Sequence, residues 1–105
     1  MILPDGLAAH IDAMAKLGAG LAGHLTPREM RFLALLGAMP TCVGEVLEIG
    51  SYKGRSTVIL AKSAAFAGQV RVCAVDPLDL PSVTDPGESE RAAIAPAFRA
   101  NLRGH

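Results

Sequence analysis

Apolar residues recur every three to four positions in the first third of the chain, which is the spacing of an amphipathic helix. The pattern predicts one helix over residues 5–18 and, after a glycine-rich stretch, a second over residues 26–37. The start of the second is well marked, because its first residue is a threonine that can act as N-cap. Pro27 suits the first helical position, and Glu29 stands where a capping-box partner is expected. We place these helices in an N-terminal helical segment, residues 1–44.

Short apolar runs follow, with the length of strands rather than helices. One covers residues 45–49, and the other, residues 70–75, is rich in valine and bounded by glycine and proline, as a buried parallel strand is. Between them, residues 54–66 have a helical pattern with Gly68 as its stop. The order strand, helix, strand predicts one right-handed βαβ unit within a second segment, residues 45–105.

Two finer predictions concern the helices of this second segment. A last helix is predicted over residues 89–103, with a kink or a split at Pro96, because proline removes a backbone donor and clashes with the preceding turn. The positions of the middle helix that we expect to pack inward are Val58, Leu60, Ala61 and Ala65.

Composition allows one small globular domain and excludes several classes of function. The 105 residues are half hydrophobic and carry ten basic and ten acidic side chains, so no net charge attracts nucleic acid or an anionic membrane. No apolar stretch approaches the roughly 18 residues of a membrane span and the N-terminus is unlike a signal peptide, which favours a cytoplasmic protein. Cys42 and Cys73 lack the spacing of a zinc or redox site and are expected to be free thiols. The histidines have no acidic or cysteine neighbours at ligand spacing, so no metal site is predicted and all three are expected to be solvated: His10, His24 and His105.

Residues 46–57, VLEIGSYKGRST, are the most informative stretch of the chain. They read as an apolar strand ending in an acid, a turn punctuated by glycines, and a helix opened by hydroxyl residues. In open α/β sheets a ligand binds outside the carboxyl ends of the strands, and small residues are needed where it approaches the turn. Asp76 follows the second predicted strand about 20 residues after Gly54, the spacing at which a carboxylate takes ribose hydroxyls. The sequence therefore predicts a ligand site at this turn.

The residue types in the turn discriminate between ligands. A dinucleotide fingerprint would need glycine where Tyr52 and Arg55 stand, and a phosphate-binding P-loop would need a longer spacing and a lysine in place of Arg55. An acid at the end of the strand, Glu48, repels a diphosphate and pairs with an ammonium or sulfonium group. The same residues also have purely structural interpretations. Gly50 and Gly54 would then only shape the turn, and Ser56 would cap the helix. Glu48 would be a buried structural acid, and Asp76 would cap the turn that follows the second strand.

Residues 48–57, followed by Ala-Val-Asp-Pro at residues 74–77, resemble motif I and the acidic position of class I S-adenosylmethionine-dependent methyltransferases. The resemblance is strongest to the small-molecule O-methyltransferase-like branch, whose motif I runs E-I-G-x-x-x-G-x-S-T. It spans about residues 26–105 and implies an α/β Rossmann-like fold, here the N-terminal half, truncated after the second parallel strand and the following helix. It further implies binding of S-adenosyl-L-methionine and methyl transfer to a small-molecule acceptor, at an oxygen.

The resemblance also implies a role for each motif residue. Glu48 would sit beside the methionine ammonium, Gly50 would let the backbone pass beneath the cofactor, and Asp76 would take the ribose hydroxyls. Ser51 and Tyr52 would line the methionine tail. Gly54 and Ser56 would open the helix.

Much of the family pattern would lie beyond His105, including the catalytic residues, so the chain alone is expected to be inactive. A non-catalytic remnant or regulatory nucleotide-binding module is the alternative function, and an NAD-binding half-domain is a less favoured one. A sheet of two parallel strands would leave its edges unpaired and apolar side chains uncovered, so self-association is also expected.

Overall fold

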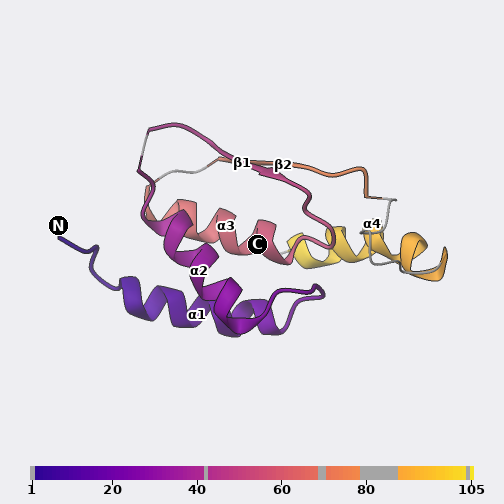
Figure 1. Ribbon diagram of the computed structural model, residues 1–105, viewed down its shortest axis with the longest axis horizontal. Coiled ribbons are helices and arrows are strands. Elements are labelled where there is room, and N and C mark those ends of the chain that lie inside the picture. Colours follow the sequence, from indigo (N-terminus) through magenta and orange to yellow (C-terminus); the bar gives the residue numbers. More distant parts are fainter. Residues whose placement is uncertain (1, 42, 69–70, 79–87, 104) are drawn as a thin grey trace.

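The described part of the chain forms four helices and one two-stranded parallel sheet (Figure 1). The structure is a computed structural model that describes residues 2–41, 43–68, 71–78, 88–103 and 105, with the backbone alone at residues 88–92. The strands pair in parallel, with Val46 opposite Val72 and Ile49 opposite Val75. The elements in chain order are α1 (Leu7–Ala19), α2 (Pro27–Ala38), β1 (Val46–Ile49), α3 (Arg55–Phe66), β2 (Val72–Val75) and α4 (Glu88–Leu102).

Local signals place the start of α2 and the end of α3 where the sequence predicts them. At the start of α2 the Thr26 amide donates to Glu29 Oε2 at 2.7 Å, and the Glu29 amide donates to Thr26 Oγ1 at 3.2 Å, which completes the capping box. At the end of α3, Gly68 adopts a left-handed φ of 88°, and its amide donates to the carbonyl of Ala65. The predicted stop at Gly68 is therefore confirmed.

The core lies between the first three helices rather than against the sheet. Its buried centre combines one residue from α1, two from α2 and one from α3, so both the 1–44 and the 45–105 segments contribute to it: Met14, Met30, Ala34 and Ile59. Helices α2 and α3 approach each other closely at Gly37, where a Cβ would lie 2.8 Å from Ser63 Cβ. Figure 1 shows α3 between the sheet and the pair α1 and α2, so α3 is covered on two sides.

This position of α3 explains why its inward face was predicted incorrectly. Val58 is buried as expected, but Leu60 is only half-buried, and Ala61 and Ala65 are exposed. An element packed on two sides buries a wider face than a periodic stripe, and alanines give little signal on either face. The residues of α3 that are buried are Thr57, Val58, Ile59, Ser63 and Ala64.

Helix α4 runs through Pro96 without interruption, so the predicted split is wrong. Pro96 is exposed, whereas Ile94 is fully buried and Phe98 is half-buried. A proline on the solvent side leaves the freed carbonyl able to bond to water, and the flanking apolar side chains hold the helix in place.

The prediction that His10 is solvated is also wrong. Its Nε2 lies 2.8 Å from Ser63 Oγ, and its ring stacks on Phe66 with the ring centroids 4.5 Å apart. Burial lowers the pKa of His10 below its ordinary value. The imidazole therefore joins α1 to α3 as a neutral group.

We expect His10 to make the free energy of unfolding depend on pH. Its pKa is depressed in the folded state and returns to about 6.5 in the unfolded chain, so the unfolded state binds more protons between these two values. The contribution of His10 is complete above about pH 6.5 and decreases as the pH falls through that window. Urea denaturation at a series of pH values should show this slope, and His10→Gln should abolish it. The exposed His105→Gln is the control that keeps it, and an unchanged slope in His10→Gln would contradict the assignment.

One face of the sheet is bare in the described part of the structure. Leu47, Ile49 and Val75 point away from α3 with 62%, 80% and 54% of their surface exposed, and Figure 1 shows no described helix on that side. Parallel sheets normally have both faces covered. The prediction of uncovered apolar side chains is confirmed. Cys73, on the same face, is an exposed free thiol, whereas Cys42 lies outside the described residues.

None of the helices in the described residues is long and apolar enough to cross a bilayer. Outside the bare sheet face, the large apolar side chains that are exposed in the described residues are Ile2, Leu3, Phe32, Leu36 and Val43.

Self-association should proceed through the bare sheet face, because contiguous exposed apolar side chains favour association. We expect sedimentation velocity to show oligomers of the purified chain, and Leu47→Glu to shift them toward monomer. Since Leu47 is already exposed, the substitution should change the free energy of unfolding by less than about 0.5 kcal/mol. Val43→Glu replaces an apolar residue outside the sheet that is even more exposed than Leu47, and it should leave the oligomers unchanged. A monomeric wild-type protein with a sharp two-state melt would contradict this expectation.

Candidate functional site

The turn between β1 and α3 lies at the carboxyl ends of both strands and is built from backbone in unusual conformations. Gly50, Tyr52 and Gly54 all have positive φ, at 86°, 49° and 87°. The Gly50 amide donates to the Val75 carbonyl at 2.8 Å, which extends the sheet by one bond, and the Gly54 amide donates to the Ser51 carbonyl at 2.8 Å. Left-handed backbone costs a non-glycine residue roughly 1–2 kcal/mol, so Tyr52 needs compensation from its surroundings.

The two motif glycines are required for different reasons. A Cβ on Gly54 would lie 2.7 Å from Leu102 Cδ1 and 2.9 Å from Phe98 Cδ2, because α4 packs directly onto this residue. A Cβ on Gly50 would meet no atom within 4 Å. Gly54 therefore serves packing, whereas Gly50 faces open space that a ligand can enter.

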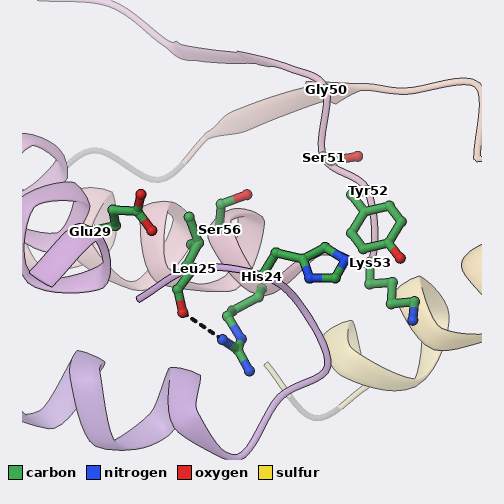
Figure 2. A pocket seen from close by; sticks show the side chains of 9 residues that line it. His24, Leu25, Glu29, Gly50, Ser51, Tyr52, Lys53 and Ser56 are labelled. Atoms are coloured by element: carbon green, nitrogen blue, oxygen red, sulfur yellow. Dashed lines mark hydrogen bonds between the residues drawn. The ribbon is translucent and has the colours of Figure 1, made fainter. Parts of the chain in front are cut away.

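A cavity of about 420 Å³ lies in front of this turn, within the range of small-molecule sites, roughly 300–1,000 Å³. Figure 2 shows that side chains from the turn and from the loop between α1 and α2 face each other across it. The lining residues are His24, Leu25, Glu29, Gly50, Ser51, Tyr52, Lys53, Arg55 and Ser56.

Asp76 joins the end of β2 to this turn. Its Oδ2 accepts a hydrogen bond from the Tyr52 amide at 2.9 Å, and its Oδ1 accepts one from the Leu78 amide at 2.7 Å. The carboxylate thus caps the turn after β2 and compensates the strained Tyr52. Asp76 is half-buried beside the turn, although it does not line the cavity itself.

Glu48 lies beneath the turn rather than in the cavity wall. Its side chain points to α3, it is 8% exposed, and its Oε1 accepts a hydrogen bond from the hydroxyl of Thr57. That bond offsets part of the cost of burying a carboxylate. Its contact with an ammonium group stays a prediction.

Four of the seven residues predicted for the site line the cavity, one contacts α4, and two are acids that lie outside the cavity lining. The lining ones are Gly50, Ser51, Tyr52 and Ser56; Gly54 packs against α4, and Asp76 and Glu48 hold the turn.

The far wall of the cavity was missed by sequence reasoning. His24 is exposed, as predicted, but its ring stacks on Tyr52 with centroids 5.0 Å apart and an interplanar angle of 18° (Figure 2). Lys53 Nζ lies 5.2 Å from the Tyr52 ring centroid. Hydrogen bonds from the backbone and side chain of Thr26 lower the pKa of Glu29, which keeps it an anion. The one sequence signal for this wall is the glycine-rich stretch before His24, because a Cβ on Gly23 would lie 2.8 Å from Arg55 Cβ.

Neither an accessible nucleophilic serine activated by histidine nor a metal site is found among the described residues. His10 and Ser63 are spaced like a base and a nucleophile, but Ser63 is 0% exposed and cannot reach a substrate. Among the described residues, no group of three or more histidine, cysteine, aspartate or glutamate side chains could hold a metal ion.

Comparisons of this chain with known protein families, with curated proteins and with solved structures find no match. The residues of the turn and the cavity are therefore the basis on which a function can be proposed.

Proposed function

We propose that this chain is the cofactor-binding part of an S-adenosylmethionine-dependent methyltransferase that methylates a small-molecule acceptor, at an oxygen. The observation that carries the proposal is the meeting of Gly50 and Asp76 at one turn. Gly50 opens onto the cavity, and the Asp76 carboxylate lies against the backbone of the same turn, at the ends of two parallel strands. In open α/β sheets, ligands that contain a nucleoside bind outside the carboxyl ends of the strands, where this turn lies.

The cofactor would supply a methyl group on a sulfonium. Transfer of that methyl group would join its carbon to the acceptor oxygen, leave the electron pair of the carbon–sulfur bond on sulfur, and release the acceptor's proton to solvent. In this chain, Gly50 would let the ligand lie close to the backbone, and the hydroxyls of Ser51 and Ser56 would bond to the amino-acid tail.

Asp76 retains the capacity to bind ribose hydroxyls. Each of its oxygens accepts one backbone hydrogen bond, and a carboxylate offers about four acceptor positions. The backbone bonds also fix the orientation of the carboxylate, which reduces the ordering cost when a ligand binds.

The alternative is a non-catalytic remnant or regulatory nucleotide-binding module. The observation in its favour is that Glu48 and Asp76 already satisfy protein groups, as acids kept only for structure would. Both candidates bind a nucleoside ligand, so turnover of the complete protein separates them. An NAD-binding half-domain is disfavoured, because the side chains of Tyr52 and Arg55 line the cavity where a dinucleotide fingerprint has glycines.

The first test compares ligands by equilibrium titration. The complete protein should bind S-adenosyl-L-methionine in preference to NAD, and Asp76→Ala should weaken that binding by roughly 1.5–3 kcal/mol through loss of charge-assisted hydrogen bonds. Asp76→Asn keeps one acceptor oxygen, for either the Tyr52 or the Leu78 amide, and loses the charge, so it should fall between wild type and Asp76→Ala. Equal affinity for the two ligands would refute the proposal.

A pair of glycine substitutions tests the position of the ligand. Gly50 and Gly68 have nearly equal φ, 86° and 88°, and a Cβ at either would meet no atom within 4 Å. Gly50→Ala and Gly68→Ala should therefore each lower the free energy of unfolding by about 1–2 kcal/mol. Only Gly50→Ala should also weaken S-adenosyl-L-methionine binding, because Gly68 lies at the other end of α3. Equal binding by the two variants would place the ligand elsewhere.

A further inference from the structure

The loop between α1 and α2, residues 20–26, forms one wall of the cavity without forming a helix or strand of its own. It supplies His24 and Leu25 to the lining, and the ring of His24 lies against Tyr52 of the opposite wall (Figure 2). A loop of this kind keeps its place only if other elements satisfy its backbone groups.

Arg55, the first residue of α3, bonds to this loop at both ends. Its Nε donates to the Leu21 carbonyl at 2.8 Å, its Nη1 donates to the Leu25 carbonyl at 2.8 Å, and its Nη2 also donates to Leu21. A Cβ on Gly23 would lie 2.8 Å from Arg55 Cβ, so the loop backbone passes directly over the arginine stem. The planar guanidinium spans two carbonyls that a lysine ammonium would reach only one at a time.

Asn101, near the end of α4, makes a second connection from the other side. Its Nδ2 donates at 2.9 Å to the carbonyls of both Ala22 and Lys53, and its Oδ1 accepts from the Ala22 amide at 3.4 Å. Asn101 is buried, so these bonds are protected from water. One amide therefore ties the loop to the turn between β1 and α3.

We propose that Arg55 and Asn101 are positioning residues that hold residues 20–26 against residues 50–54 and so pre-form the cavity wall that carries His24 and Leu25. Neither residue needs to touch the reacting atoms. A wall that is already in place removes the cost of ordering it when a ligand binds, and a wall that is formed only part of the time lowers the apparent affinity by that fraction. The effect on ligand affinity rests on the proposed function, whereas the order of the wall does not.

The chain contains a reporter for the order of this wall. Tyr52 is its one tyrosine, and the chain has no tryptophan, so the tyrosine bands in near-ultraviolet circular dichroism and fluorescence come from the ring that stacks on His24. His24→Ala defines the signal of an unstacked ring.

The experiment compares wild type, Arg55→Lys and Asn101→Ala with Arg71→Lys as the matched control. Arg71 makes an exposed ion pair with Glu45 at the opposite end of the sheet. Arg55→Lys and Asn101→Ala should each change the Tyr52 signal toward that of His24→Ala while far-ultraviolet circular dichroism stays unchanged. Their affinity for S-adenosylhomocysteine should fall about tenfold if the ordered wall falls to a tenth of the population. Arg71→Lys should match wild type in every measurement.

Wild-type Tyr52 signals in both variants would overturn the proposal. If wild type binds no S-adenosylhomocysteine, the proposed function fails, but the Tyr52 signals still decide whether the two residues order the wall. If the variants do not fold, hydrogen exchange of the wild-type protein decides, because the Ala22 amide donates to Asn101. Protection of that amide comparable to the amides of α3 supports the proposal, and exchange as fast as at an open loop overturns it.

Discussion

The hydrogen bond from the Tyr52 amide to Asp76 is the interaction on which the site depends. The chain must leave β1, pass three residues of left-handed backbone and enter α3, and only two of those residues are glycines. The third, Tyr52, is strained, and its amide points to a carboxylate carried by the next strand. Asp76 thereby fixes the turn relative to both strand ends, and a displaced turn would move Gly50 away from the cavity.

Other contacts follow from the position of that turn. Because α3 begins immediately after Gly54, its first side chain, Arg55, points back to the loop between α1 and α2. Because Gly54 has no side chain, α4 approaches closely enough for Asn101 to reach the turn and the loop together. Elements far apart in the sequence thus meet at one end of the sheet.

The sequence predicts well those features that residues close together in the chain determine. The start of α2 follows from Thr26 and Glu29, the end of α3 follows from Gly68, and the candidate turn follows from glycines placed after an apolar strand. Where the prediction failed, distant packing decides. His10 is half-buried because Ser63 and Phe66 of α3 lie against it, and nothing near His10 in the sequence indicates those partners.

The same distinction applies to the candidate site. Gly50 and Ser56 belong to a recognisable local pattern, whereas His24, Leu25 and Glu29 reach the cavity through a tertiary contact between α2, the loop before it and α3. Asp76 could be predicted as an acid after a strand, but its bond to Tyr52 depends on the register of β1 with β2. Sequence spacing therefore identifies the wall that one segment builds alone, and misses the wall that a second segment supplies.

The bare sheet face and the cavity are formed by different parts of the structure. Leu47, Ile49 and Val75 lie on the side of the sheet away from α3, while the cavity walls come from the turn, α3, α2 and the loop before α2. Covering the bare face would bury apolar surface and stabilise the sheet without adding to those walls. It would still affect the turn through the pairing of β1 with β2, because Gly50 bonds to Val75 and Tyr52 bonds to Asp76. A partner on the bare face would therefore act on the cavity by stiffening the strand ends rather than by contacting a ligand.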